Sequence, residues 1–143
     1  MKAFTLVELI SVLAIVAVLI FLGLPTYTRF YSFVQFWGDG RKITSDLRGF
    51  HQQSISDHYD YHFNFVDNKN YNITKYQGAT FIELIKQVQM QPTVSITSAI
   101  TPIIFYPLGN ADPAGDATIV LGNSEGDTST ITVRSTTGHV FIQ

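Results

Sequence analysis

The most constraining feature of this sequence is an almost uninterrupted apolar stretch near its N-terminus. Residues 4–25 contain three polar side chains, Thr5, Glu8 and Ser11, and end at Pro25. As an α-helix, this stretch would be about 31 Å long, which is enough to cross the hydrocarbon core of a bilayer. The sequence therefore predicts a membrane-spanning helix over these residues.

Glu8 is an ionisable residue inside the apolar stretch. A charged side chain in a membrane helix costs about 2.5–3.5 kcal/mol on insertion scales, so its presence indicates a functional role. Residues 1–3, Met-Lys-Ala, precede the stretch, and no small-x-small pair follows it. This order differs from that of a secretory signal peptide, in which the apolar block comes before the cleavage site.

These N-terminal residues resemble the signature of type IV pilins and type II secretion pseudopilins. The matching features are a short basic leader, Phe4 followed by Thr-Leu-Val-Glu, and an apolar run that ends at a proline. The resemblance implies that a prepilin peptidase cleaves between Ala3 and Phe4 and that the new Phe4 amine is N-methylated. It also implies that subunits polymerise through the apolar helix. The family usually has Gly before the cleaved bond, where this chain has Ala3. The alternative is a plain membrane anchor on an unrelated periplasmic domain.

The same resemblance implies an assembly role for Glu8. Its carboxylate would pair with the cationic Phe4 amine of a neighbouring subunit in a filament, or with the amine of its own chain. Charge pairs strengthen as the dielectric constant falls, and such a pair would fix the axial register of sliding apolar helices. Because some tip subunits of the family lack this Glu, its presence favours a subunit that docks onto another rather than the outermost one.

Composition limits what the rest of the chain can be. The chain has 143 residues, so a single domain of about 115 residues remains after the anchor. The net charge is −2, which gives no global field that attracts nucleic acid. There are no cysteines, which argues against the C-terminal disulfide loop common in major type IV pilins.

The helix is predicted to continue beyond the membrane span. Pro25 lacks a backbone N–H and clashes with the preceding turn, so we expect a kink there, assisted by Gly23. The aromatic and apolar residues that follow would lie at the level of the lipid headgroups, or pack against the head or neighbouring subunits. These residues are Tyr27, Phe30, Tyr31, Phe33, Val34, Phe36 and Trp37.

The sequence Gly38-Asp39-Gly40 predicts a loosening or break of this helix, because each glycine costs about 1 kcal/mol relative to alanine. The helix then resumes to about Ser56, with an apolar stripe at Ile43, Leu47 and Phe50 that should pack on a sheet. The charged residues around the stripe are expected to form a solvated or inter-subunit face. They are Asp39, Arg41, Lys42, Asp46 and Arg48.

The remainder of the chain is rich in predicted strands. Alternating residues indicate a hairpin of 61–66 with 71–76, and further strands are expected at 94–96, 103–106, 118–121 and 131–134. Thr80 and Glu83 match a helical capping box, which predicts a short helix with one apolar face. That face would carry Phe81, Leu84, Ile85 and Val88.

These elements predict an α+β fold in which a long N-terminal helix packs on an antiparallel β-sheet. We expect four segments in chain order. They are a leader peptide at 1–3, a transmembrane and polymerisation helix at 4–25, an amphipathic continuation at 26–57 and a β-rich globular head at 58–143.

The second half of the chain resembles the GspH/FimT-like minor pseudopilins and pilins. The matching motifs are Asp46-Leu47-Arg48, Phe105-x-Pro107-x-Gly109 and residues 137–140, Thr-Gly-His-Val. The resemblance implies a sheet sandwich on the helix and a place near the filament tip as an assembly primer. The chain would sit in the inner membrane with a periplasmic head and then enter a type IV pilus or a type II secretion pseudopilus. Its partners would be other subunits, prepilin peptidase and the inner-membrane assembly platform.

Candidate residues for chemistry are few, and we expect neither catalysis nor a cofactor. The sequence has no Cys nucleophile, no GxSxG, no Walker loop and no HExxH. Two acidic or histidine clusters could hold a metal, but a polar rim and solvated turns are the favoured interpretations. The first cluster is Asp57, His58, Asp60 and His62, and the second is Asp112, Asp116, Glu125 and Asp127.

Two other functions compete with a structural subunit. A competence pilin would capture DNA through basic residues, but residues 87–143 contain one Lys or Arg, Arg134, so nucleic acid is an unfavoured partner. A membrane-anchored adhesin is the second alternative, and nothing in the sequence names a ligand for it.

Overall fold

The structure, a computed structural model, describes residues 5–99 and 102–143, without the side chain of Pro25. A helix of 52 residues, α1 (Leu6–Asp57), opens the described chain and is followed by short strands. The strands are β1 (Asp60–Phe65), β2 (Asn70–Gln77), β3 (Thr80–Gln89), β4 (Val94–Ala99), β5 (Ile103–Phe105), β6 (Ala111–Asp112), β7 (Ala117–Asn123), β8 (Thr128–Val133) and β9 (Val140–Ile142).

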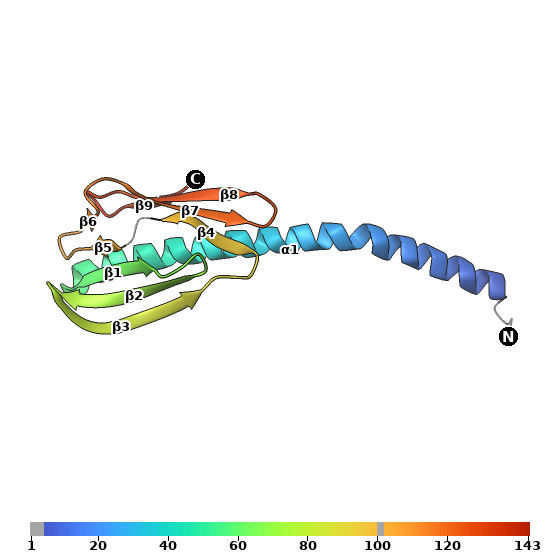
Figure 1. Cartoon of the computed structure of the whole chain (residues 1–143), viewed down its shortest axis with the longest axis horizontal. Helices are drawn as coiled ribbons and strands as arrows, with labels where there is room; N and C mark the ends of the chain where they lie inside the picture. Colours follow the sequence, from blue (N-terminus) through green and yellow to red (C-terminus); the bar gives the residue numbers. More distant parts are fainter. Residues whose placement is uncertain (1–4, 100–101) are drawn as a thin grey trace.

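The strands form two antiparallel sheets on the C-terminal half of α1. One sheet has the order β3-β2-β1-β5-β6 and the other the order β4-β7-β8-β9. Figure 1 shows both sheets along the same half of the helix, while the N-terminal half projects away from them. We call the sheets together with this half of α1 the head. The predicted α+β class is therefore confirmed, with two antiparallel sheets where the residue pattern indicated one.

The core of the head lies between α1 and the two sheets. Ile43 and Leu47 of the predicted stripe are fully buried and Phe50 is partly buried. Alternate residues of the strands meet them, because successive side chains of a strand point to opposite faces. The buried strand residues include Tyr61 and Phe63 on β1, Tyr71 and Ile73 on β2, Ile119 and Leu121 on β7, and Ile131 and Val133 on β8.

The predicted break at Gly38-Asp39-Gly40 is wrong, because α1 runs through these residues without interruption. Tertiary packing offsets the low helix propensity of the two glycines. Asp39 is buried, and its carboxylate accepts a hydrogen bond of 2.7 Å from the backbone N–H of Gln91. A Cβ at Gly40 would lie 3.5 Å from Ile142, so this turn of the helix passes close to the second sheet.

The predicted short helix over 81–88 is also wrong, because these residues belong to β3. The strand pairs with β2 along its whole length, with register shifts at two places. Of the predicted apolar face, Val88 is buried, whereas Phe81, Leu84 and Ile85 are exposed. β3 is an edge strand of its sheet and most of its side chains are exposed, so its sequence lacks the strict alternation of a half-buried strand.

Candidate assembly helix and its junction with the head

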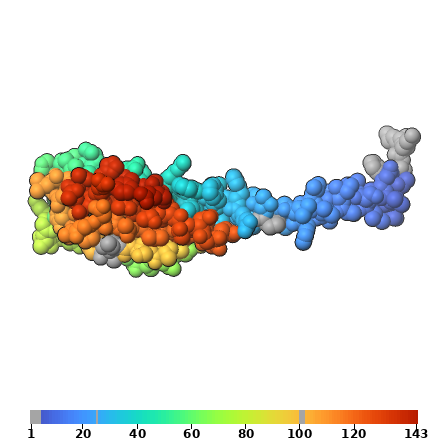
Figure 2. Space-filling view, turned by 90° about the horizontal axis from the view of Figure 1, so that it is seen from above, coloured from blue at the N-terminus to red at the C-terminus, as the bar shows by residue number. Residues whose placement is uncertain are grey.

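The N-terminal half of α1 is apolar on all sides, and no described residue of the head covers it. Among the described residues, α1 is the one helix that is long and apolar enough to cross a membrane. Figure 2 shows this half, in blue, as a narrow rod that extends from the head. A helix that is hydrophobic all round must be buried in lipid or against other helices. Its exposed apolar side chains are Leu6, Val7, Leu9, Ile10, Val12, Leu13, Ile15, Val16, Val18, Leu19, Ile20, Phe21, Leu22 and Leu24.

The start of α1 is fixed by a reciprocal pair of hydrogen bonds between Thr5 and Glu8. The Thr5 hydroxyl oxygen accepts from the Glu8 backbone N–H at 3.2 Å, and Glu8 Oε2 accepts from the Thr5 backbone N–H at 2.9 Å. The Thr5 hydroxyl lies 2.9 Å from the same carboxylate oxygen. This is a capping box, which satisfies backbone donors that the first turn leaves unpaired. The predicted cleavage and methylation sites, Ala3 and Phe4, lie outside the described residues.

The kink expected at Gly23 and Pro25 stays a prediction. The backbone of α1 is helical at both positions, and a Cβ at Gly23 would meet no atom within 4 Å. Figure 1 shows the blue half of α1 inclined to the half that lies on the sheets, while the helix remains continuous.

The aromatic residues after the predicted span divide into two groups. Phe36 is 3% exposed and belongs to the core of the head. Tyr27 and Tyr31 are exposed and stack with their ring centroids 6.3 Å apart, and Phe33 packs edge-on against Trp37 at 6.0 Å. Packing against the head therefore accounts for Phe36, whereas contact of the exposed rings with lipid headgroups or neighbouring subunits stays a prediction.

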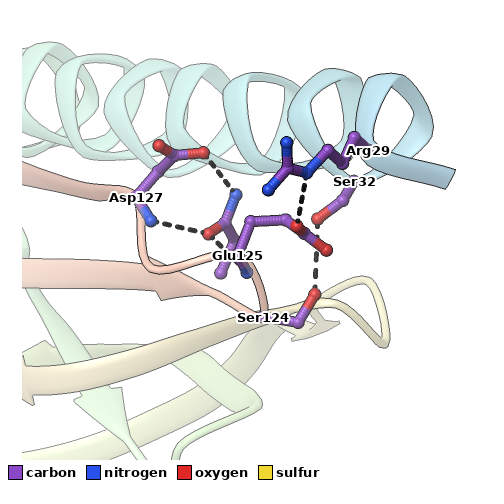
Figure 3. Close-up of polar contacts among 6 residues, drawn as sticks. Arg29, Ser32, Ser124, Glu125 and Asp127 are labelled. Atoms are coloured by element: carbon purple, nitrogen blue, oxygen red, sulfur yellow. Dashed lines mark hydrogen bonds and ion pairs between the residues drawn. The ribbon is translucent and has the colours of Figure 1, made fainter. Parts of the chain in front are cut away.

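A turn between β7 and β8 contacts α1 where the helix leaves the head (Figure 3). Arg29 Nε lies 3.3 Å from Glu125 Oε2, and the Ser32 and Ser124 hydroxyl oxygens are 3.5 Å apart. The Arg29 side chain is 79% exposed, so this ion pair contributes little to stability. These contacts place the turn at the end of the second sheet against α1.

The turn itself, residues 123–127, is ordered by Asn123. The Asn123 side-chain oxygen accepts from the backbone N–H groups of Glu125 and Asp127 at 3.0 and 2.8 Å, and its amide donates to Asp127 Oδ2 at 2.8 Å. We call residues 123–127 the acidic turn.

The triplet Asp46-Leu47-Arg48 attaches both sheets to α1. Asp46 accepts hydrogen bonds from the Tyr71 hydroxyl at 2.8 Å and from Lys86 Nζ at 2.6 Å, which connects the helix to β2 and β3. Burial, and then this hydrogen bond, raise the pKa of Tyr71 well above its ordinary value. Arg48 donates through Nε and Nη2 to the backbone oxygen of Val140 at 3.1 and 2.9 Å, which holds β9.

The expectation that Asp39 and Asp46 belong to a solvated face is therefore wrong. The Asp39 carboxylate meets the backbone N–H of Gln91 in the connection between β3 and β4, and the Asp46 carboxylate meets the Tyr71 hydroxyl of β2. Helical periodicity places a residue on a face of the helix, but it does not say which donors from distant strands meet that face. The signal available in the sequence was the position of each Asp beside the stripe.

The first candidate metal cluster is dispersed. Asp57 accepts from Gln53, Tyr61 and Ser56, and the bonds from Gln53 and then Tyr61 lower its pKa. His58 caps the C-terminus of α1 in a left-handed conformation with φ of 60°, whereas His62 stacks on Tyr76 with ring centroids 4.1 Å apart. In residues 5–99 and 102–143, no three His, Asp or Glu side chains are arranged to hold a metal ion.

The second cluster is also divided between separate contacts. Glu125 and Asp127 are engaged by Arg29 and Asn123. Asp116 accepts a hydrogen bond of 3.4 Å from the backbone N–H of Ser135, in a different turn. These side chains stabilise the conformations of turns.

Comparison with known proteins gives a structural match. No protein-family model matches the chain, and no curated protein matches its sequence. The crystal structure of the type IV minor pilin FimU from Pseudomonas aeruginosa strain PAO1 is similar in fold, with a TM-score of 0.64 and 12% sequence identity. The match covers 80% of this chain and 92% of that chain. The likeness shows that this chain has the pilin fold.

Proposed function

We propose that this chain is a structural minor pilin or pseudopilin without a catalytic role. It would insert in the inner membrane through residues 4–25, carry residues 26–57 as a helical support and present residues 58–143 as a periplasmic head. The observation that carries the proposal is the bare apolar half of α1 next to a fully packed head. Exposure of these apolar side chains to water is unfavourable, so the stable environments of the helix are lipid and the core of a filament.

In this proposal, prepilin peptidase removes residues 1–3 and the new Phe4 amine is methylated. The processed subunit then meets other subunits at the assembly platform and enters a type IV pilus or a type II secretion pseudopilus near its tip. Glu8 pairs with the Phe4 amine of a neighbour, which makes this chain a subunit that docks onto another. The position of Glu8 supports the role, because it lies in the first turn of α1, four positions after Phe4 in the sequence.

The test is the intact mass of the chain recovered from membranes. Cells that contain a prepilin peptidase should yield a chain that lacks three residues and carries one methyl group, and cells without the peptidase should yield the full-length chain. Ala3→Gly should speed the conversion, because Gly is the residue that this peptidase usually meets. Full-length chain alone from cells with an active peptidase contradicts the proposal.

A further inference from the structure

The sheet that contains β1, β2 and β3 has an outer face that carries aromatic and amide side chains. On its inner face, Tyr61 packs on Phe50 of α1 and the Tyr71 hydroxyl bonds to Asp46 of α1. Successive side chains of a strand point to opposite faces, so the residues between these lie on the outer face. Six of them are at least partly exposed, and we call them the outer platform. They are the rings of His62, Tyr76 and Phe81 and the amides of Asn64, Asn72 and Gln87.

The three rings of the outer platform form a continuous row across the three strands, which lie side by side along α1 (Figure 1). His62 stacks on Tyr76 with ring centroids 4.1 Å apart, and Tyr76 meets Phe81 edge-on at 5.5 Å. Phe81 remains 53% exposed in spite of this contact. Because each ring is held by its neighbour, the row offers a fixed apolar surface to a ligand with a flat apolar face.

The three amides lie beside the row of rings on the same strands. Asn64 lies opposite Asn72 in the register of β1 with β2, and Asn72 lies opposite Gln87 in that of β2 with β3. Asn64 Nδ2 donates to Asn72 Oδ1 at 3.0 Å and to the Thr74 hydroxyl oxygen at 3.1 Å. Within the described part of the chain, the Asn64 side-chain oxygen and the Asn72 amide group have no further partner. They leave an acceptor and a donor for a ligand.

The outer platform carries no positive charge. Lys75 and Lys86, the basic residues of β2 and β3, interact instead with carboxylates of α1. Burial lowers the pKa of His62, which favours the neutral imidazole at pH 7. Asp60, opposite Tyr76, adds a carboxylate beside the rings. This charge disfavours a polyanion such as DNA, which needs Lys and Arg, and a wholly apolar partner would leave the amides without water or a hydrogen-bond partner.

We propose that the outer platform binds a neutral oligosaccharide. The C–H groups on the face of a pyranose ring pack on Phe81 and Tyr76, and its hydroxyl groups, which both donate and accept, meet the amides. Phe81 and Gln87 are six positions apart, at most about 20 Å along the strand, so the surface is long enough for several sugar units. This activity is additional to the proposed subunit role and does not depend on cleavage or on filament entry.

The test is isothermal titration calorimetry of the full-length chain in a detergent without a sugar head group. The probes are three neutral hexasaccharides: maltohexaose, cellohexaose and chitohexaose. At least one should bind, and Phe81→Ala and Gln87→Ala should each weaken its binding about fivefold. Two matched controls on α1, Phe33→Ala at a ring that is 50% exposed and Gln52→Ala at an exposed amide, should leave the affinity unchanged.

Both platform positions are exposed, so the two variants should melt near the wild-type temperature. Binding of none of the three probes overturns the inference, as does wild-type affinity in either platform variant. An equal loss of affinity in Phe33→Ala and Phe81→Ala also overturns it, because the contact would then not be specific to the platform. A hyaluronan hexasaccharide, which carries carboxylates, should bind more weakly than the neutral probe, and equal or tighter binding contradicts a neutral ligand. None of these outcomes alters the intact mass of the processed chain, which tests the proposed function separately.

Discussion

Phe36 and Phe33 provide a matched test of where the head begins. Both lie on α1 within one turn of each other, but Phe36 is 3% exposed and Phe33 is 50% exposed. Replacement of a buried phenylalanine by alanine costs about 3–5 kcal/mol. Phe33 packs on Trp37, and the loss of an exposed edge-on contact costs about 0.5–1 kcal/mol. Phe36→Ala should therefore destabilise the head several times more than Phe33→Ala.

The assay is thermal and urea unfolding of a soluble fragment that begins at Arg29. For a domain of about 115 residues, 1 kcal/mol corresponds to roughly 3–6 °C, so Phe36→Ala should lower the Tm by about 10–30 °C. A fragment that begins at Arg41 should show a similar loss, because it lacks both Phe36 and the buried Asp39. Equal effects of the two alanine variants would refute the assignment of Phe36 to the core.

Three further predictions concern the head. Leu47→Ala should cost about 2–5 kcal/mol in urea unfolding, whereas Leu108→Ala, at a residue that is 94% exposed, should leave the midpoint nearly unchanged. Tyr71→Phe should cost about 1–2 kcal/mol, because it removes the buried hydrogen bond to Asp46; an unchanged midpoint would contradict this. Burial lowers the pKa of His62 below its ordinary value, so the stability it contributes is present above about pH 6.5 and is lost as the pH falls through the folded pKa. His62→Gln should therefore reduce the loss of stability between about pH 7 and 5, and an identical pH dependence would contradict the shift.

The capping-box pattern occurs twice in the sequence, and it marks the start of a helix at only one of the two places. Thr80 and Glu83 have the spacing of a capping box, yet they lie in β3, where pairing with β2 overrides the local preference. Thr5 and Glu8 have the same spacing and do form a capping box at the start of α1. A local motif therefore identifies a helix start only when the following residues have no better partner elsewhere.

The elements with strong periodicity were predictable. The buried stripe that contains Leu47 and the hairpin of β1 with β2 follow from spacing alone. The buried role of Asp39 depends on the Gln91 backbone, 52 positions away, and so could not be derived from local spacing. The hydrogen bonds from Arg48 to the backbone oxygen of Val140 likewise depend on the fold, because the two residues are 92 positions apart.

The most direct test of the central claim is the incorporation of a Glu8→Val variant into filaments. Loss of a charge pair worth about 1.4 kcal/mol per subunit corresponds to a factor of about ten. Two controls isolate the carboxylate: Thr5→Val breaks the capping box and keeps Glu8, and Ser11→Val removes a nearby polar side chain that bonds to its own helix. The measurement is the ratio of processed chain in sheared filaments to processed chain in membranes. We predict that this ratio falls about tenfold for Glu8→Val and stays near wild type for both controls. A wild-type ratio for Glu8→Val would contradict assembly through this residue.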